Sequence, residues 1–186
     1  MRTGLFARRI CEITCRQKAL FLQVLFPLSH LLHDDSAWAG RGRQFSAKVK
    51  DLTEWLAPRI SDFGFRISDL GPVTYHDACH LAHPQRITKP PRDLVRAVAG
   101  KNFVELPEAD VCCGSAGSYN LTEPEMAERL QRRKIQKILQ TGAQIVVTSN
   151  PGCILQIRAG LEKAGAKEIQ VLHIADYLLA AVGSQN

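Results

Sequence analysis

The sequence predicts an α/β fold, with a mostly parallel sheet of about four strands, flanking helices and a helical segment before them. From residue 72 onward, short apolar strands alternate four times with helical patterns. This alternation implies right-handed crossovers between parallel strands, with helices packed on the sheet. The chain has 186 residues, of which 45% are hydrophobic, and these values suit one compact domain.

Residues 1–44 form a basic segment without a clear hydrophobic period, and residues 45–71 are predicted to contain an amphipathic helix and a linker. The helix prediction rests on apolar side chains along one stripe: Phe45, Val49, Leu52 and Leu56. The linker prediction rests on a tandem copy, in which R-I-S-D-F-G-F at 59–65 is followed by R-I-S-D-L-G-P at 66–72. Units this short do not build a repeat fold, so we interpret the copy as a duplicated loop.

Residues 72–186 carry the alternating elements. The predicted strands are V-T-Y-H at 73–76, F-V-E-L at 103–106, I-V-V-T-S at 145–149 and I-Q-V-L at 169–172. The predicted helices run over 91–99, from a T-x-x-E capping box at Thr122 and Glu125 to Gly142, over 151–164 and over 175–182. Gly100, Gly142 and Gly165 are interpreted as helix stops.

The net charge of +6 does not predict a nucleic-acid partner, because the basic excess is confined to the first third of the chain. Residues 61–186 carry fourteen Lys or Arg against thirteen Asp or Glu. The densest basic run there comprises Arg129, Arg132, Arg133, Lys134 and Lys137. Glutamates at helical spacing accompany this run, so it predicts a solvated helix face, with a docking patch for an acidic partner as the alternative.

The N-terminal sequence predicts neither a membrane span nor an export signal. Basic residues precede the apolar run A-L-F-L-Q-V-L-F-P-L at 19–28, and Ala37-Trp38-Ala39 has the form of a cleavage site. However, Gln23 and Pro27 interrupt the run, which is shorter than the ~20 residues that a membrane helix needs. We therefore expect a cytoplasmic protein that does not insert into the membrane directly.

Four cysteines follow predicted strands: Cys79 the first, Cys112 and Cys113 the second, and Cys153 the third. Because the carboxyl ends of parallel strands meet at one edge of a sheet, these thiols are expected to converge there. Gly114 and Gly117 supply the turn that lets two adjacent thiols reach one centre. Four thiolates suit an iron–sulfur cluster or a structural zinc site, with unliganded buried cysteines or disulfides as alternatives, whereas Cys11 and Cys15 are interpreted as incidental.

Three motifs resemble the cysteine-rich CCG domain family. They are Y-H-D-A-C-H-L-A-H at 75–83, C-C-G-S-A-G-S-Y-N-L at 112–121 with P-E-M-A after it, and S-N-P-G-C-I-L-Q-I at 149–157. The likeness assigns residues 72–186 to such a domain and is strongest to the second CCG domain of glycolate oxidase iron–sulfur subunits. That group is related to lactate-utilisation proteins and to a subunit of heterodisulfide reductase.

The resemblance implies that Cys79, Cys112, Cys113 and Cys153 are the ligands of a [4Fe–4S] cluster, with zinc as the alternative centre. Gln156 stands where the broader family has a further cysteine, which argues against a five-cysteine cluster. Residues expected around the ligands are His76, His80, His83, Gly114, Asn150 and His173.

The resemblance also implies a role in electron transfer and not in catalysis. The expected partners are a flavin-containing 2-hydroxy-acid oxidase subunit and other iron–sulfur modules, through which the chain would lie peripherally at the inner face of the membrane. The chain lacks the ferredoxin-type motif and the first CCG set, so it looks like the carboxyl third of such a subunit. The alternative from another class is a zinc-stabilised module for subunit interaction without electron transfer.

Overall fold

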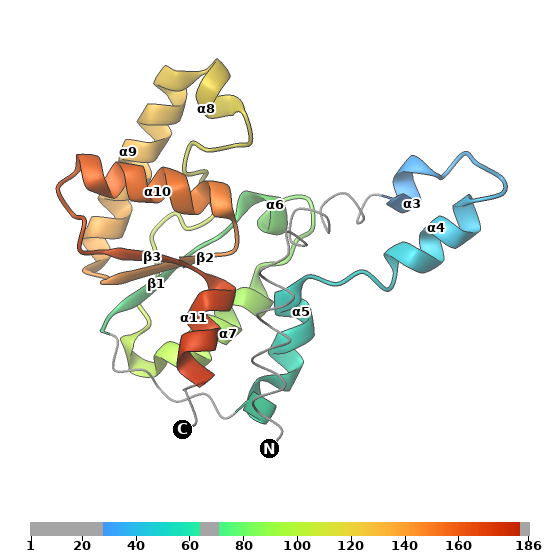
Figure 1. Ribbon diagram of the computed structural model, residues 1–186, viewed down its shortest axis with the longest axis horizontal. Helices are drawn as coiled ribbons and strands as arrows, with labels where there is room; N and C mark the ends of the chain where they lie inside the picture. The colour runs from blue at the N-terminus through green and yellow to red at the C-terminus, as the bar shows by residue number, and fades with distance from the viewer. Residues whose placement is uncertain (1–27, 64–70, 183–186) are drawn as a thin grey trace. The chain divides into compact units, whose positions relative to one another are not determined.

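The structure of the protein is a computed structural model that describes residues 28–63 and 71–182. It comprises two compact units, Met1–Arg59 and Ile60–Asn186, which are considered separately. Their boundary falls within the segment 45–71, where the sequence predicts a linker. Element labels follow Figure 1.

The first unit contains the helices α3 (Leu28–Leu31), α4 (Ala39–Ser46) and α5 (Leu52–Leu56). The continuous helix predicted from Phe45 to Leu56 is therefore wrong, because the chain leaves the helical path between Ser46 and Leu52. Asp51 starts the new helix: its carboxylate accepts a hydrogen bond from the Thr53 backbone N–H at 2.8 Å, while the Glu54 carboxylate accepts one from the Asp51 N–H at 3.1 Å. Such a reciprocal cap favours a helix start over a helix interior.

The duplicated segment is described only in part, over residues 59–63 of the first copy and 71–72 of the second. Residues Ala57–Phe63 form a 3₁₀ helix, η1, and not an irregular loop, whereas residues 64–70 lie outside the described part of the chain. The basic segment before residue 28, with Cys11 and Cys15, also lies outside it.

The second unit is built on a parallel sheet whose described strands are β1 (Val73–His76), β2 (Ile145–Thr148) and β3 (Gln170–His173), in the order β1-β2-β3 (Figure 1). The register pairs Val73 with Ile145 and His76 with Thr148, and Ile145 with Gln170. The strand β2, in the middle, is buried along its whole length, as its continuous apolar sequence indicates. The predicted α/β fold with a parallel sheet is confirmed.

The predicted strand F-V-E-L at 103–106 does not form. Phe103 makes a single parallel bridge to Val73, and the Val104 N–H donates to the Val73 carbonyl at 2.8 Å. No further pairing follows in residues 104–106, and the chain turns over residues 107–110. The segment therefore lies beside β1 where a fourth strand was expected, but it is too short to be one.

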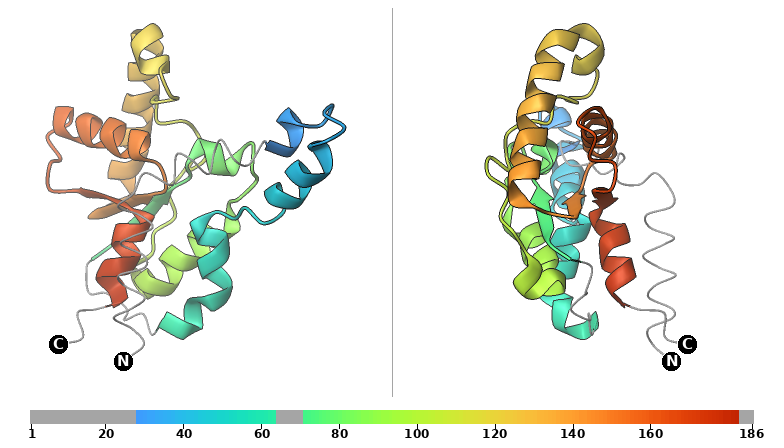
Figure 2. Two further views of the ribbon diagram at one scale, coloured as in Figure 1. Left: turned by 45° about the vertical axis from the view of Figure 1, so that its right-hand side comes forward. Right: turned by 90° about the vertical axis from the view of Figure 1, so that its left-hand side faces the viewer.

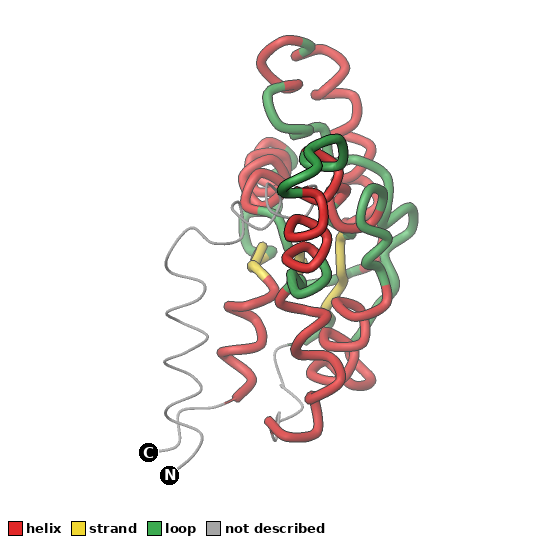
Figure 3. The backbone as a smooth tube through the Cα atoms, turned by 90° about the vertical axis from the view of Figure 1, so that its right-hand side faces the viewer, coloured by secondary structure: helices red, strands yellow, loops and turns green. Residues whose placement is uncertain are grey.

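Helices cover both faces of this sheet: α9 (Pro124–Thr141) and α10 (Pro151–Lys163) lie on one face, and α7 (Lys89–Ala99) and α11 (Ile174–Val182) on the other (Figures 1 and 2). The short helices α6 (Cys79–Ala82) and α8 (Tyr119–Thr122) belong to loops around the sheet. Figure 3 shows the strands enclosed by helix and loop. None of the described helices is long and apolar enough to cross a membrane.

The four longer helices match the sequence predictions, with two corrections on α9. Gly142, at φ 66°, ends this helix as expected, but the predicted capping box is absent, because the Thr122 hydroxyl donates to the Tyr119 carbonyl inside α8. The predicted solvated basic face also fails at one residue. Arg132 and Arg133 are exposed, whereas Lys134 is only 1% exposed and lies on the stripe that faces the sheet.

The contact between α9 and α10 depends on Gly160. A Cβ built at this position would lie 2.7 Å from Ile135 Cγ1 and 2.9 Å from Gln131 Cγ. Real side chains do not approach so closely, and the two helices share the core residues Ile135, Ile138, Ile157 and Leu161. Glycine at 160 therefore sets how near these helices can pack.

Gly160→Ala should destabilise the protein by about 1–3 kcal/mol, because the added methyl group overpacks the interface between α9 and α10. Chemical denaturation followed by circular dichroism measures the change. Gly40→Ala is the matched control, since Gly40 lies in α4 with nothing within 4 Å of its Cβ position. That substitution should leave stability unchanged or raise it by up to about 1 kcal/mol.

Candidate metal centre

The loops that carry the four cysteines meet at the carboxyl ends of β1 and β2. Cys79 is the first residue of α6, three residues after β1 ends, and Cys153 lies in the first turn of α10 after β2. The sequence predicts that Cys112 and Cys113 follow a strand, but they follow a loop. This loop is joined to the end of β1 by the hydrogen bond from the Asp77 N–H to the Ala109 carbonyl, at 3.1 Å. The parallel pairing of β1 and β2 thus brings residues 74 positions apart to one edge.

The thiols form a continuous chain of contacts. Along the series Cys79, Cys112, Cys113 and Cys153, each thiol lies close enough to the next to shift its pKa. All four are free thiols, with Cys113 and Cys153 buried and the other two half-buried. The convergence predicted from the sequence is therefore present in the structure.

His76 completes the arrangement on the buried side. One donor atom each from His76, Cys113 and Cys153 lie within 4.8 Å of one another. The His76 imidazole is hydrogen-bonded to Cys153, and its Nδ1 atom has no hydrogen-bond partner among the described residues. A buried ring nitrogen is costly to leave unpaired, so this atom is a candidate donor to a bound group or its surroundings.

The other predicted histidines are not part of the compact group formed by His76, Cys113 and Cys153. The Asn150 side-chain amide donates to His80 Nδ1 at 2.9 Å, and its Oδ1 atom accepts from the Gly152 and Cys153 N–H groups, so Asn150 links the starts of α6 and α10. His83 is exposed and contacts the Asp110 carbonyl at 3.2 Å, and His173 accepts from the Ala175 N–H at the start of α11. His80 and Asn150 thus position two of the loops that carry the cysteines. His83 and His173 instead contact main-chain groups of Asp110 and Ala175.

The adjacent cysteines share the site because the backbone turns at Gly114. This residue has φ +92°, and its N–H donates to Cys112 Sγ at 3.3 Å. A Cβ here would lie 2.3 Å from the Ala127 carbonyl oxygen, so only glycine fits. Gly117 also has positive φ, at +67°, but nothing lies near its Cβ position.

The thiols affect one another's ionisation. Hydrogen bonds from Cys113 and Cys79 lower the pKa of Cys112 to about 2, and a hydrogen bond from Cys113 lowers the pKa of Cys153 to about 5. The same contact with Cys112 raises the pKa values of Cys79 and Cys113, and burial raises both further. Two thiolates are therefore stabilised by two neutral thiols, and ionising all four requires a cation among them.

Two charged groups at this edge were not found from the sequence. The Lys134 ammonium donates to the carbonyls of Glu108 and Ala109. Asp77, buried beside Cys79, forms an ion pair with Arg92 at 2.6 Å. The sequence pattern of α9 could have predicted that Lys134 is buried. This residue shares one helical face with the other buried residues of the helix, Ala127, Gln131, Ile135 and Ile138.

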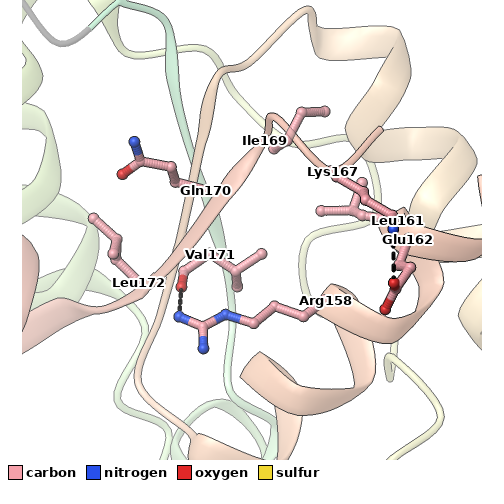
Figure 4. Close-up of a pocket in the computed structure, with 8 residues that line it drawn as sticks. All are labelled: Arg158, Leu161, Glu162, Lys167, Ile169, Gln170, Val171 and Leu172. Atoms are coloured by element: carbon pink, nitrogen blue, oxygen red, sulfur yellow. Dashed lines mark hydrogen bonds and ion pairs between the residues drawn. The ribbon is translucent and has the colours of Figure 1, made fainter. Parts of the chain in front are cut away.

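A separate hollow of about 440 Å³ lies between α10 and β3 (Figure 4). Its charged side chains are already engaged, because Arg158 donates to the Val171 carbonyl at 2.6 Å and Lys167 pairs with Glu162 at 3.0 Å. None of the predicted site residues lines it. The thiol cluster, and not this hollow, is the candidate site.

Comparisons with known proteins agree with the geometry. The family model described as "CCG: Cysteine-rich domain" matches residues 73–158, which include all four clustered cysteines. The chain is 39% identical over 160 residues to "Probable glycolate oxidase iron-sulfur subunit" of Bacillus subtilis, an alignment that covers 83% of this chain and 35% of that protein.

Two further relatives carry related names. "Lactate utilization protein A" of Bacillus pumilus is 33% identical, over 87% of this chain and 66% of that protein. A subunit of the CoM/CoB fumarate reductase of Methanothermobacter marburgensis is 37% identical, over 70% of this chain and 26% of that protein. The chain therefore spans less than two thirds of each of these relatives.

Gly114→Ala should impair metal binding, because its methyl group collides with the Ala127 carbonyl and its φ value is unfavourable. Strain of about 1–3 kcal/mol in this loop should weaken binding by about tenfold or more. Titration with Co²⁺, followed by thiolate-to-metal charge-transfer absorption, measures the affinity. Gly117→Ala, in the same loop, shares the cost of a positive φ but meets no atom within 4 Å, so it should lose clearly less affinity than Gly114→Ala; equal losses in both variants would contradict the role given to the Ala127 contact.

Proposed function

We propose that the chain is a member of the cysteine-rich CCG domain family, whose model matches residues 73–158, and that it binds an iron–sulfur cluster and passes electrons within a 2-hydroxy-acid oxidase complex. The observation that carries this proposal is the contact of thiols from three loops at one sheet edge. Such an arrangement has no use in packing, where a single buried thiol suffices.

The donor set fits a [4Fe–4S] cluster. Cys79, Cys112, Cys113 and Cys153 offer four thiolates, which is the ligand count of this cluster type. The mutual pKa shifts of neighbouring thiols support a shared site, and a cation among them would allow all four to ionise. Gly114 and Asn150 hold the backbone of two of the ligand loops.

The name of one relative supports a proposal for the direction of electron flow. The Bacillus subtilis protein is named as an iron–sulfur subunit of glycolate oxidase, and such an enzyme removes two electrons and two protons from a 2-hydroxy acid. In the proposed complex a flavin subunit takes both electrons, and the cluster carries them one at a time toward a membrane acceptor. The residues of this chain hold the cluster and exclude water, and binding at the inner face of the membrane would come through partners.

Zinc is the second candidate, and one observation favours it. The set of His76, Cys113 and Cys153 is compact and buried, and mixed nitrogen and sulfur ligands are typical of zinc. A zinc ion there would stabilise the fold and a subunit interface without carrying electrons. Iron and zinc leave different spectra, so purification separates the two proposals.

Protein purified without oxygen should be brown, with broad visible absorption and about four irons per chain. Iron and sulfide analysis with visible spectroscopy makes the measurement. Colourless protein with one zinc per chain would reject electron transfer and favour the structural module. Co-purification of a flavoprotein from the native host tests the partner independently.

Single Cys→Ser substitutions at 79, 112, 113 and 153 should each lower the iron content to less than about half, because each removes one of four ligands. Iron per chain is measured after anaerobic reconstitution, with circular dichroism to verify folding. Cys11→Ser is the matched control and should keep the iron, since Cys11 lies outside the motifs. Full iron in any one of the four variants would remove that residue from the ligand set.

A further inference from the structure

Lys134 places a positive charge inside the protein where packing alone would favour an apolar side chain. Its side chain is on α9 and is 1% exposed, like the buried Ile135 after it and unlike the exposed Arg133 before it. An isolated ammonium group is costly to bury unless a negative charge compensates it. The identity of the compensating charge therefore bears on what this residue does.

No carboxylate in the described residues forms an ion pair with the Lys134 ammonium. Glu108, whose main-chain carbonyl accepts from Lys134, directs its carboxylate to Arg133 at 2.7 Å and to Lys137 at 3.7 Å. Lys134 instead donates to the main-chain carbonyls of Glu108 and Ala109. These carbonyls reduce the cost of burial, but they leave the charge itself uncompensated.

The contact with Ala109 places this charge at the junction of the ligand loops. The Ala109 carbonyl also accepts the Asp77 N–H at 3.1 Å, two residues before Cys79, and Ala109 itself lies three residues before Cys112. Burial lowers the pKa of Lys134, which is the direction expected for an ammonium group without an ion-pair partner. The buried ammonium therefore lies against the loop that leads into Cys112 and Cys113, where a thiolate-bound centre would add negative charge.

We propose that the Lys134 ammonium is the buried counter-charge of the thiolate-bound centre and raises its reduction potential. This inference rests on the proposed function, since it concerns the same cluster. A reduced cluster carries one more negative charge than an oxidised one, so a nearby buried cation favours the reduced form. Lys134 touches none of the thiols through a hydrogen bond, and it acts through charge as a positioning and tuning residue.

Lys134→Gln tests this, because glutamine keeps N–H donors for the two carbonyls and removes the charge. The equilibrium constant for one-electron reduction should fall by about tenfold, which corresponds to a potential about 59 mV more negative. Redox titration of the intact chain, loaded without oxygen and monitored by electron paramagnetic resonance, measures the potential. Arg133→Gln removes the same charge from the exposed neighbour and should shift the constant by less than about twofold.

Each outcome decides the question. An unchanged potential in fully loaded Lys134→Gln, or an equal shift in Arg133→Gln, overturns the inference. If Lys134→Gln does not retain iron, Lys134→Arg is compared: retention in that variant supports the requirement for charge, whereas its loss assigns Lys134 a role in shape alone. Wild-type protein that binds no iron would instead refute the proposed function, so the two failures are distinguishable.

Discussion

The parallel register of β1 and β2 is the constraint on which the site depends. Pairing Val73 with Ile145 and His76 with Thr148 ends both strands at the same level, so Cys79 at the start of α6 and Cys153 in the first turn of α10 come to the same edge. The hydrogen bond from Asp77 to Ala109 adds the third loop to this edge. A slip of one residue in the pairing would turn each side chain of β1 to the other face of the sheet and separate the ligands.

Charge is the second constraint, and it explains groups that packing does not. Thiols within hydrogen-bonding reach cannot all ionise without a cation, as the raised pKa values of Cys79 and Cys113 indicate. A buried ammonium at Lys134 and an unpaired ring nitrogen at His76 would both destabilise a purely apolar core. A thiolate-bound centre in the folded protein would offset the free energy that burying these two groups costs. Binding of the centre would then contribute directly to the stability of the fold.

The sequence predicted most of the sheet and the convergence of the cysteines because both follow from local patterns. Continuous apolar runs such as Ile145–Thr148 specify buried parallel strands, and cysteines placed after such runs must reach one edge. The errors arose where a local preference competed with the pattern. Asp51 starts a new helix within an apolar stripe, Phe103 makes only a single bridge to Val73, and Lys134 is buried by contacts with a loop 25 and 26 residues away. Such long-range contacts leave no trace in composition or in a charge count.

The most direct test of the central claim is a crystal structure of anaerobically purified protein with anomalous scattering measured at the iron edge. The account predicts a compact group of iron peaks bonded to the Sγ atoms of Cys79, Cys112, Cys113 and Cys153. A single peak at the zinc edge, held by His76, Cys113 and Cys153 with the other two thiols unbound, would contradict it.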